Sequence, residues 1–152
     1  MLWMALAMAD DLLPTPYTAD QIRDACVQGL QIHWDNRDGA NTVRQVWTVV
    51  EHGEEQVSFA YAIEGEETVT RQFGWEELRQ HASFPAASTT KEDVTLETAM
   101  GPVEAWHYTV AGEPRKDFWF AKEWAGPPAL MTVTHEGTVV ARMEQVLRVP
   151  PS

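Results

Sequence analysis

The chain has 152 residues, and its 23 acidic against 11 basic side chains give a formal net charge of −12. One domain is expected at this length, and it is long enough to bury a sizeable core. A surface this acidic argues against nucleic acid and against anionic lipid headgroups, because both select basic surfaces. The seven tryptophans predict either a bulky core or an aromatic-lined pocket.

The N-terminal segment indicates export. The run Met1–Ala9 is apolar, ends in Ala-Met-Ala, and is followed by two aspartates. This resembles a signal-peptidase site, and the run is too short to span a bilayer. We therefore expect a periplasmic or secreted protein; the alternative is an apolar segment packed on a cytoplasmic domain. Pro14 and Pro16 predict an extended lead-in. The expected organisation is an N-terminal segment over residues 1–17, including a signal-peptide remnant, and a single β-rich domain over 18–152.

A first helix is expected from Ala19 to Gln28. Thr18 and Gln21 have the spacing of a capping box, and Gly29 suits the position after a helix C-terminus. Cys26 is the only cysteine, so no intrachain disulfide can form. Its helical spacing relative to apolar neighbours predicts a buried side chain.

Alternating apolar and polar residues dominate the rest of the chain, apart from a short helix expected at Trp75–Ala82. The last strand, Thr138–Val149, places every second apolar residue on one face, and this face is expected to be buried: Val139, Ala141, Met143, Leu147 and Val149. The fold class is mainly β. We expect a curled antiparallel meander, a half-barrel or open barrel of about eight or nine strands, with two short helices.

Two helices of about 15 Å each cannot cover eight strands that lie about 4.8 Å apart. The sheet must therefore curl around its apolar face, which leaves either a ligand cavity or a filled core. The large side chains in phase on that face would line either one: Trp34, Trp47, Phe59, Tyr61, Trp106, Tyr108, Phe118, Phe120, Met131 and Met143.

No pattern of catalytic or metal-binding residues stands out. The five histidines have no zinc-motif spacing, and His33 and His107 are expected as surface imidazoles on polar strand faces. Adjacent glutamates such as Glu54-Glu55 fall in turns, and no nucleophile elbow, phosphate loop or dinucleotide fingerprint is present. We expect a protein that is not an enzyme and has no cofactor and no metal.

The loop Trp124–Pro128 has a specified shape, because two prolines stiffen it and Gly126 permits a tight bend. Trp124 is a candidate contact site for a partner. The alternative is that Trp124 folds back onto the core as a lid.

Two stretches resemble a known group of proteins. Glu97–Tyr108 has a small-residue and glycine turn leading to an aromatic pair, and Asp117–Lys122 is an aromatic strand near a Gly/Pro loop. They resemble secreted bacterial β-proteins of unknown function, which are similar to the half-barrels of the lipoprotein-carrier (LolA/LolB-like) group. The resemblance covers about the last third of the chain. It implies an incomplete barrel closed by helices, with an apolar concave face that can hold acyl chains.

The expected function is therefore non-catalytic binding of an apolar small molecule, a lipid or a lipid-bearing partner in the curled sheet. One alternative is a structural or interaction module with a filled core, which contacts a protein partner through Trp124 and a sheet edge. A second alternative is an enzyme without a recognisable motif.

Overall fold

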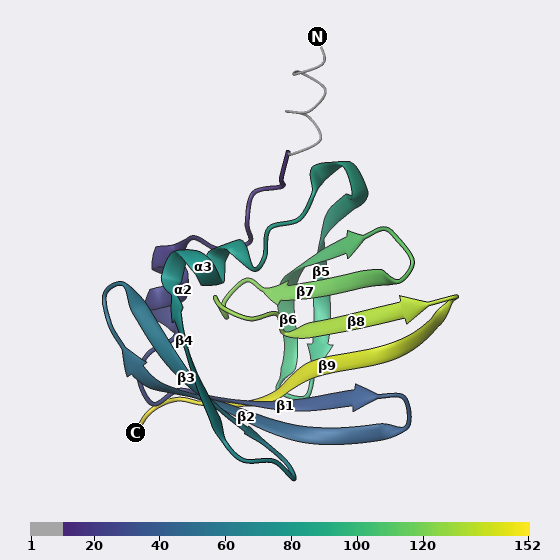
Figure 1. The fold of residues 1–152 in the computed structure, drawn as a ribbon. Helices are drawn as coiled ribbons and strands as arrows, with labels where there is room; N and C mark the ends of the chain where they lie inside the picture. Colours follow the sequence, from purple (N-terminus) through teal and green to yellow (C-terminus); the bar gives the residue numbers. More distant parts are fainter. Residues whose placement is uncertain (1–10) are drawn as a thin grey trace.

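The computed structural model describes residues 11–152 and contains one nine-stranded antiparallel sheet (Figure 1). The strand order is β4-β3-β2-β1-β9-β8-β7-β6-β5. The strands are β1 (Gln31–Asp38), β2 (Asn41–His52), β3 (Gln56–Ile63), β4 (Val69–Gly74), β5 (Thr89–Thr98), β6 (Gly101–Val110), β7 (Arg115–Ala121), β8 (Leu130–His135) and β9 (Thr138–Val149). Strands that follow one another in the chain pair with each other, except β4 and β5, and β9 joins the two series by pairing with β1.

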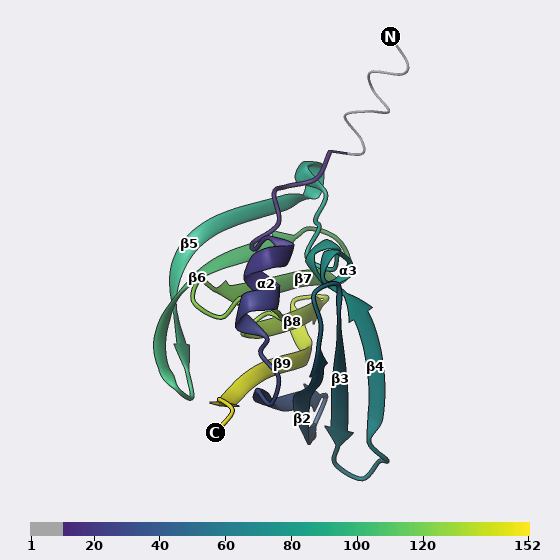
Figure 2. The same ribbon diagram turned by 90° about the vertical axis from the view of Figure 1, so that its left-hand side faces the viewer.

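The sheet is curled but not closed. Strands β4 and β5 form its two edges, and each pairs with one neighbour only. Figure 2 shows β5 and β6 facing β3 and β4 across the concave side, with helix α2 between them. The expected fold class, a mainly β half-barrel with two short helices, is confirmed.

Helix α2 (Ala19–Ala25) begins at the expected capping box. The Gln21 amide donates to Thr18 Oγ1 at 3.1 Å, and the Thr18 amide donates to Gln21 Oε1 at 2.9 Å. The helix is shorter than expected because the chain after it joins the sheet. Gly29, at φ 93°, donates its amide to the Val49 carbonyl at 2.8 Å, a conformation that glycine adopts readily.

Helix α3 (Trp75–Gln80) follows β4 directly and also ends earlier than expected. Trp75 is 5% exposed, and its indole N–H donates to the Gly53 carbonyl at 2.9 Å, which fixes the helix to the β2–β3 turn. The chain then passes Phe84 and a single 3₁₀ turn, Ala86–Ser88, before β5. Both helices lie on the concave side of the sheet and contact each other (Figure 1).

The last strand has the expected bounds, but its expected single apolar face is wrong. The register of β1 against β9 passes from His33–Leu147 to Trp34–Gln145, so one residue bulges out. A second bulge lies where β9 meets β8. Each bulge reverses the alternation of side chains. As a result Leu147 is 46% exposed and Val139 is 54% exposed, whereas Met143 faces the concave side.

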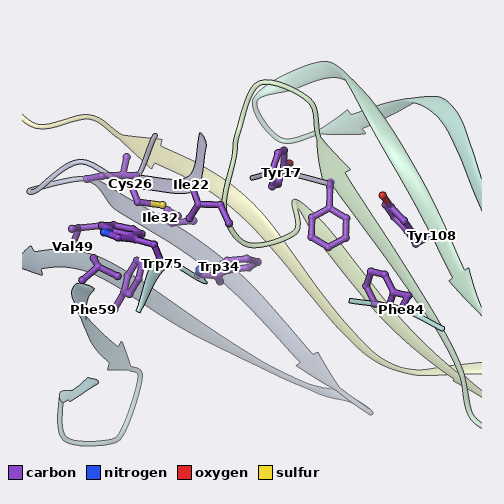
Figure 3. Close-up of a cluster of buried hydrophobic side chains, with 13 residues drawn as sticks. Tyr17, Ile22, Cys26, Ile32, Trp34, Val49, Phe59, Trp75, Phe84 and Tyr108 are labelled. Carbon is purple, nitrogen blue, oxygen red and sulfur yellow. The ribbon is translucent and has the colours of Figure 1, made fainter. Parts of the chain in front are cut away.

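The hydrophobic core lies between the concave face and the two helices (Figure 3). In this view Trp34 lies between two groups of side chains. One group lies around Ile32, Val49, Phe59 and Trp75, and the other lies around Phe84 and Tyr108. Cys26 is fully buried, as the helical spacing predicts.

The chain enters the domain through a packed segment. Leu13 donates its amide to the Phe84 carbonyl at 2.9 Å, and Tyr17 is 4% exposed, with its hydroxyl donating to the Ala121 carbonyl. The apolar run Met1–Ala9, on which the export expectation depends, lies outside the described residues. Among residues 11–152, none of the helices has the length and hydropathy needed to cross a bilayer.

Candidate functional site

A cavity of about 310 Å³ lies between the concave face and the two helices. Its sheet-side wall comes from β1, β2, β3, β4, β7, β8 and β9. Eight of the ten side chains that alternation places on this face line the cavity: Trp34, Trp47, Phe59, Tyr61, Phe118, Phe120, Met131 and Met143. Period-two patterning therefore locates most of the wall, because it reports which face a side chain occupies.

The roof of the cavity comes from the helices and a loop. Helix α2 contributes Ile22, and α3 and the turn after it contribute Leu78, His81 and Ala82. The Gly126–Pro128 part of the β7–β8 loop forms the rim. Alternation along the strands cannot reveal these roof residues, because they lie outside the strands. The spacing of Leu78 to His81 and Ala82, three and four positions on, is the available signal for one face of a helical turn.

Two of the ten expected lining residues do not reach the cavity. Tyr108 is fully buried because Phe84 packs on it, with ring centroids 5.1 Å apart. Trp106 lies instead in an open groove beside α2, where it contacts Tyr17 edge-on at 5.8 Å. Lys91 and Lys122 lie over the Trp106 ring, at 5.2 and 5.5 Å from its centroid.

The cavity is apolar with a few polar groups in its wall. Burial raises the pKa of the Cys26 thiol to about 11 and raises the pKa of Tyr61, so both stay neutral at physiological pH. The Trp47 indole N–H donates to Gln45 Oε1 at 3.1 Å. The Trp34 indole N–H meets no acceptor among the described residues. Such a lining favours uptake of an apolar group.

The convex face carries a polar cluster behind β7. Asp117 is 3% exposed and accepts hydrogen bonds from Thr109 at 2.9 Å and from the Arg115 guanidinium at 3.0 Å. His107 Nε2 lies 2.7 Å from the same carboxylate, and the imidazole stacks on Trp119 at 4.1 Å. His107 lies on the polar outer face of its strand, as expected, but this packing leaves its side chain only 17% exposed.

Burial of the Asp117 carboxylate opposes its ionisation, but the hydrogen bonds from His107, Thr109 and Arg115 outweigh burial and hold its pKa below the usual range. Since Phe118 and Phe120 face the cavity, Asp117 and Trp119 point to the opposite side of β7. This cluster braces the sheet from outside and is separate from the cavity.

The Trp124–Pro128 loop is tied to β9. Trp124 is half-buried, and the Arg148 guanidinium carbon lies 5.2 Å from its ring centroid. Gln145, 1% exposed, donates its side-chain amide to the carbonyls of Pro127 and Pro128, at 3.3 and 3.0 Å. Trp124 is therefore neither fully exposed nor folded into the core, and it is not among the side chains that line the cavity.

Within residues 11–152, no group of three or more His, Cys, Asp or Glu side chains is arranged to hold a metal ion. His107 and Asp117 meet on the convex face and not in the cavity.

Comparison with known proteins identifies the fold. No protein-family model and no curated protein sequence matches the chain. Among solved structures, the complex of Pseudomonas aeruginosa MucA and MucB aligns with a TM-score of 0.63 and 10% identity, over 88% of this chain and 56% of that chain. The crystal structure of MucB gives 0.62 and 12%, over 88% and 57%. MucB in complex with MucA(peri) gives 0.61 and 11%, over 86% and 53%.

The chain thus spans little more than half the length of these neighbours. At such identities the likeness shows a shared fold. The incomplete barrel implied by the resemblance to lipoprotein carriers is the architecture observed.

Proposed function

We propose that the protein is a non-enzymatic binding module of the periplasm or the exterior, which engages a partner protein and takes up an apolar group of that partner in its cavity. The observation that carries the proposal is the apolar cavity of about 310 Å³ beneath the two helices. Burial of apolar surface there would contribute about 25 cal/mol per Å². The mechanism needs no covalent step.

Two findings support a protein partner. Two of the solved structures with this fold are complexes of MucB with a second protein, which is MucA in one and MucA(peri) in the other. This chain also leaves two sheet edges unpaired within the described residues, at β4 and β5. The proposed location rests on the apolar run Met1–Ala9 with its small residues before two aspartates.

A second candidate function is uptake of a free apolar molecule or a lipid. The specific observation in its favour is the cover over the cavity. Side chains from α2, α3 and the Pro127-Pro128 rim surround the space, which suits a compact ligand.

Photo-crosslinking in the producing cell separates the two candidates. Benzoylphenylalanine placed at Leu78, in the cavity roof, should give an adduct with the mass of a specific protein if a partner inserts an apolar group. An adduct with the mass of a lipid would favour the second candidate. Val139, which is 54% exposed on β9, is the control position. Absence of any adduct specific to Leu78 would contradict both.

A further inference from the structure

Arg148 is a partly buried cation without a carboxylate. It lies on β9 opposite Ile32 and therefore faces the concave side. Among the described residues, no carboxylate oxygen lies within 4.0 Å of its guanidinium. Arg142, on the same strand, has Glu144 Oε2 at 3.2 Å. Among the described residues, Arg37, Arg71, Lys91 and Lys116 also have no carboxylate partner, but these four side chains are exposed to solvent, whereas Arg148 is partly buried.

The Arg148 guanidinium is held in one place. Its Nη1 donates to Gln145 Oε1 at 2.7 Å, and Trp124 packs against its face. Gln145 is itself fixed, because its amide group donates to the carbonyls of Pro127 and Pro128. A guanidinium has five N–H donors. Among the described residues, the Arg148 guanidinium makes one side-chain hydrogen bond, to Gln145. The remaining donors are therefore oriented in advance.

Burial of the Arg148 charge costs solvation free energy, and no ion pair with a described residue offsets this cost. Burial lowers the pKa of Arg148, which shows that its environment disfavours the charged form. A partly desolvated cation is stabilised when an anion pairs with it, and a planar guanidinium matches a carboxylate in a two-bond geometry. The side chain keeps some solvent access, so an external anion can reach it.

We propose that Arg148 and Trp124 form a receiving site for a carboxylate of the partner protein, an aspartate or glutamate flanked by an apolar residue. The Arg148 guanidinium binds the carboxylate, and the apolar residue next to that carboxylate packs against the Trp124 ring. Because Pro127 and Pro128 line the cavity rim and also hold Gln145, the site adjoins the cavity. The identity of the partner rests on the proposed binding function, whereas the presence of the anion site does not.

The test is titration with propionate, with propionamide as the isosteric neutral control, at constant ionic strength kept with NaCl. The readout is the indole ¹⁵N–¹H resonance of Trp124, assigned with W124F. We expect a saturable shift with propionate only. R148Q should weaken binding at least tenfold, and R142Q, the matched control from the same strand, should leave it unchanged.

Three results would overturn the inference: no saturable shift beyond that of NaCl, equal shifts with propionamide, or equal losses in R148Q and R142Q. A separate titration with inorganic phosphate tests the carboxylate preference, and equal or tighter binding of phosphate would contradict it. If R148Q does not fold, R148K keeps the charge but loses the planar fork, and weaker binding by R148K is the expected result. Failure of the cavity to take up an apolar group would leave these outcomes unchanged, so the two proposals fail separately.

Discussion

The two halves of the concave face carry similar side chains but differ in how they are covered. On the half formed by β1 to β4, Trp34, Trp47 and Tyr61 line an open cavity. On the half formed by β5 to β7, Phe118 and Phe120 also line the cavity, but Tyr108 is fully buried beneath Phe84. Aromatic content is therefore not what makes a cavity here. The difference is that Phe84, from a connecting segment, packs directly on Tyr108.

Phe84 is the residue that covers Tyr108 in the second half. It comes from the loop between α3 and β5, is 6% exposed, and lies 4.9 Å from Phe118 and 5.1 Å from Tyr108 between ring centroids. The roof of the cavity contains Ile22, Leu78, His81 and Ala82, and among the described residues no phenylalanine from outside the strands lines it. Substitutions in either half of the concave face test this difference in cover.

The largest effect is expected for Phe84→Ala, which should make the closed half resemble the open one. Loss of a buried phenyl group costs about 3–5 kcal/mol of unfolding free energy through lost transfer energy and a new cavity. Urea unfolding measures the loss. A cost below about 1 kcal/mol would show that Phe84 is not what fills this half.

Asp117→Asn tests the brace behind the closed half. Removing the carboxylate leaves the groups around it with a weaker acceptor, and we expect a loss of about 2 kcal/mol at neutral pH. The Asp117 pKa is lowered on folding, so its stabilisation is present above the unfolded pKa of about 3.9 and is lost as pH falls through the folded pKa.

Unfolding measured across acid pH checks the sign of this effect. The wild-type protein should lose stability below about pH 4 more steeply than Asp117→Asn, since the variant lacks that titration. Parallel pH profiles for the two proteins would contradict the assignment of Asp117 as a carboxylate stabilised by folding.

Thr18→Ala should act on the helix that lies between the two halves. Loss of the hydrogen bond from the Gln21 amide to the Thr18 hydroxyl costs about 1 kcal/mol at a helix N-terminus. Urea unfolding measures the change, and Thr18→Ser, which keeps the hydroxyl, is the control. Equal losses in both variants would argue against a capping contribution.

The smallest effect is expected for Ala82→Leu, which adds apolar volume to the roof of the open half. Filling a cavity stabilises a protein by about 0.5–1 kcal/mol when the new side chain fits. Thermal unfolding measures the gain, with Val139→Leu as an exposed control. A loss of stability would indicate that the cavity roof cannot accept the added volume.

Much of this architecture could be predicted from the sequence. Alternation in β3 places Phe59 and Tyr61 on the inner face because side chains of a strand alternate with a period of two. The bulges in β9 cannot be predicted from alternation, because an extra residue is defined only by its pairing with the partner strand. Strict alternation therefore places Leu147 on the wrong face.

The site was less predictable than the fold, because its cover depends on long-range packing. Phe84 belongs to a loop without periodicity, so no pattern indicates that it seals Tyr108 and leaves Trp47 uncovered. The pairing of Arg148 with Trp124 joins a strand to a distant loop, and neither local sequence contains a signal for the other.

The most direct test of the central claim is titration with the apolar fluorophore N-phenyl-1-naphthylamine, followed by energy transfer from tryptophan. Trp34 and Trp47 line the cavity, so a bound fluorophore should quench their emission. We expect saturable binding that Ala82→Leu weakens at least fivefold and Val139→Leu leaves unchanged. No saturable transfer in the wild-type protein, or equal binding by both variants, would contradict the account of this cavity as a binding site.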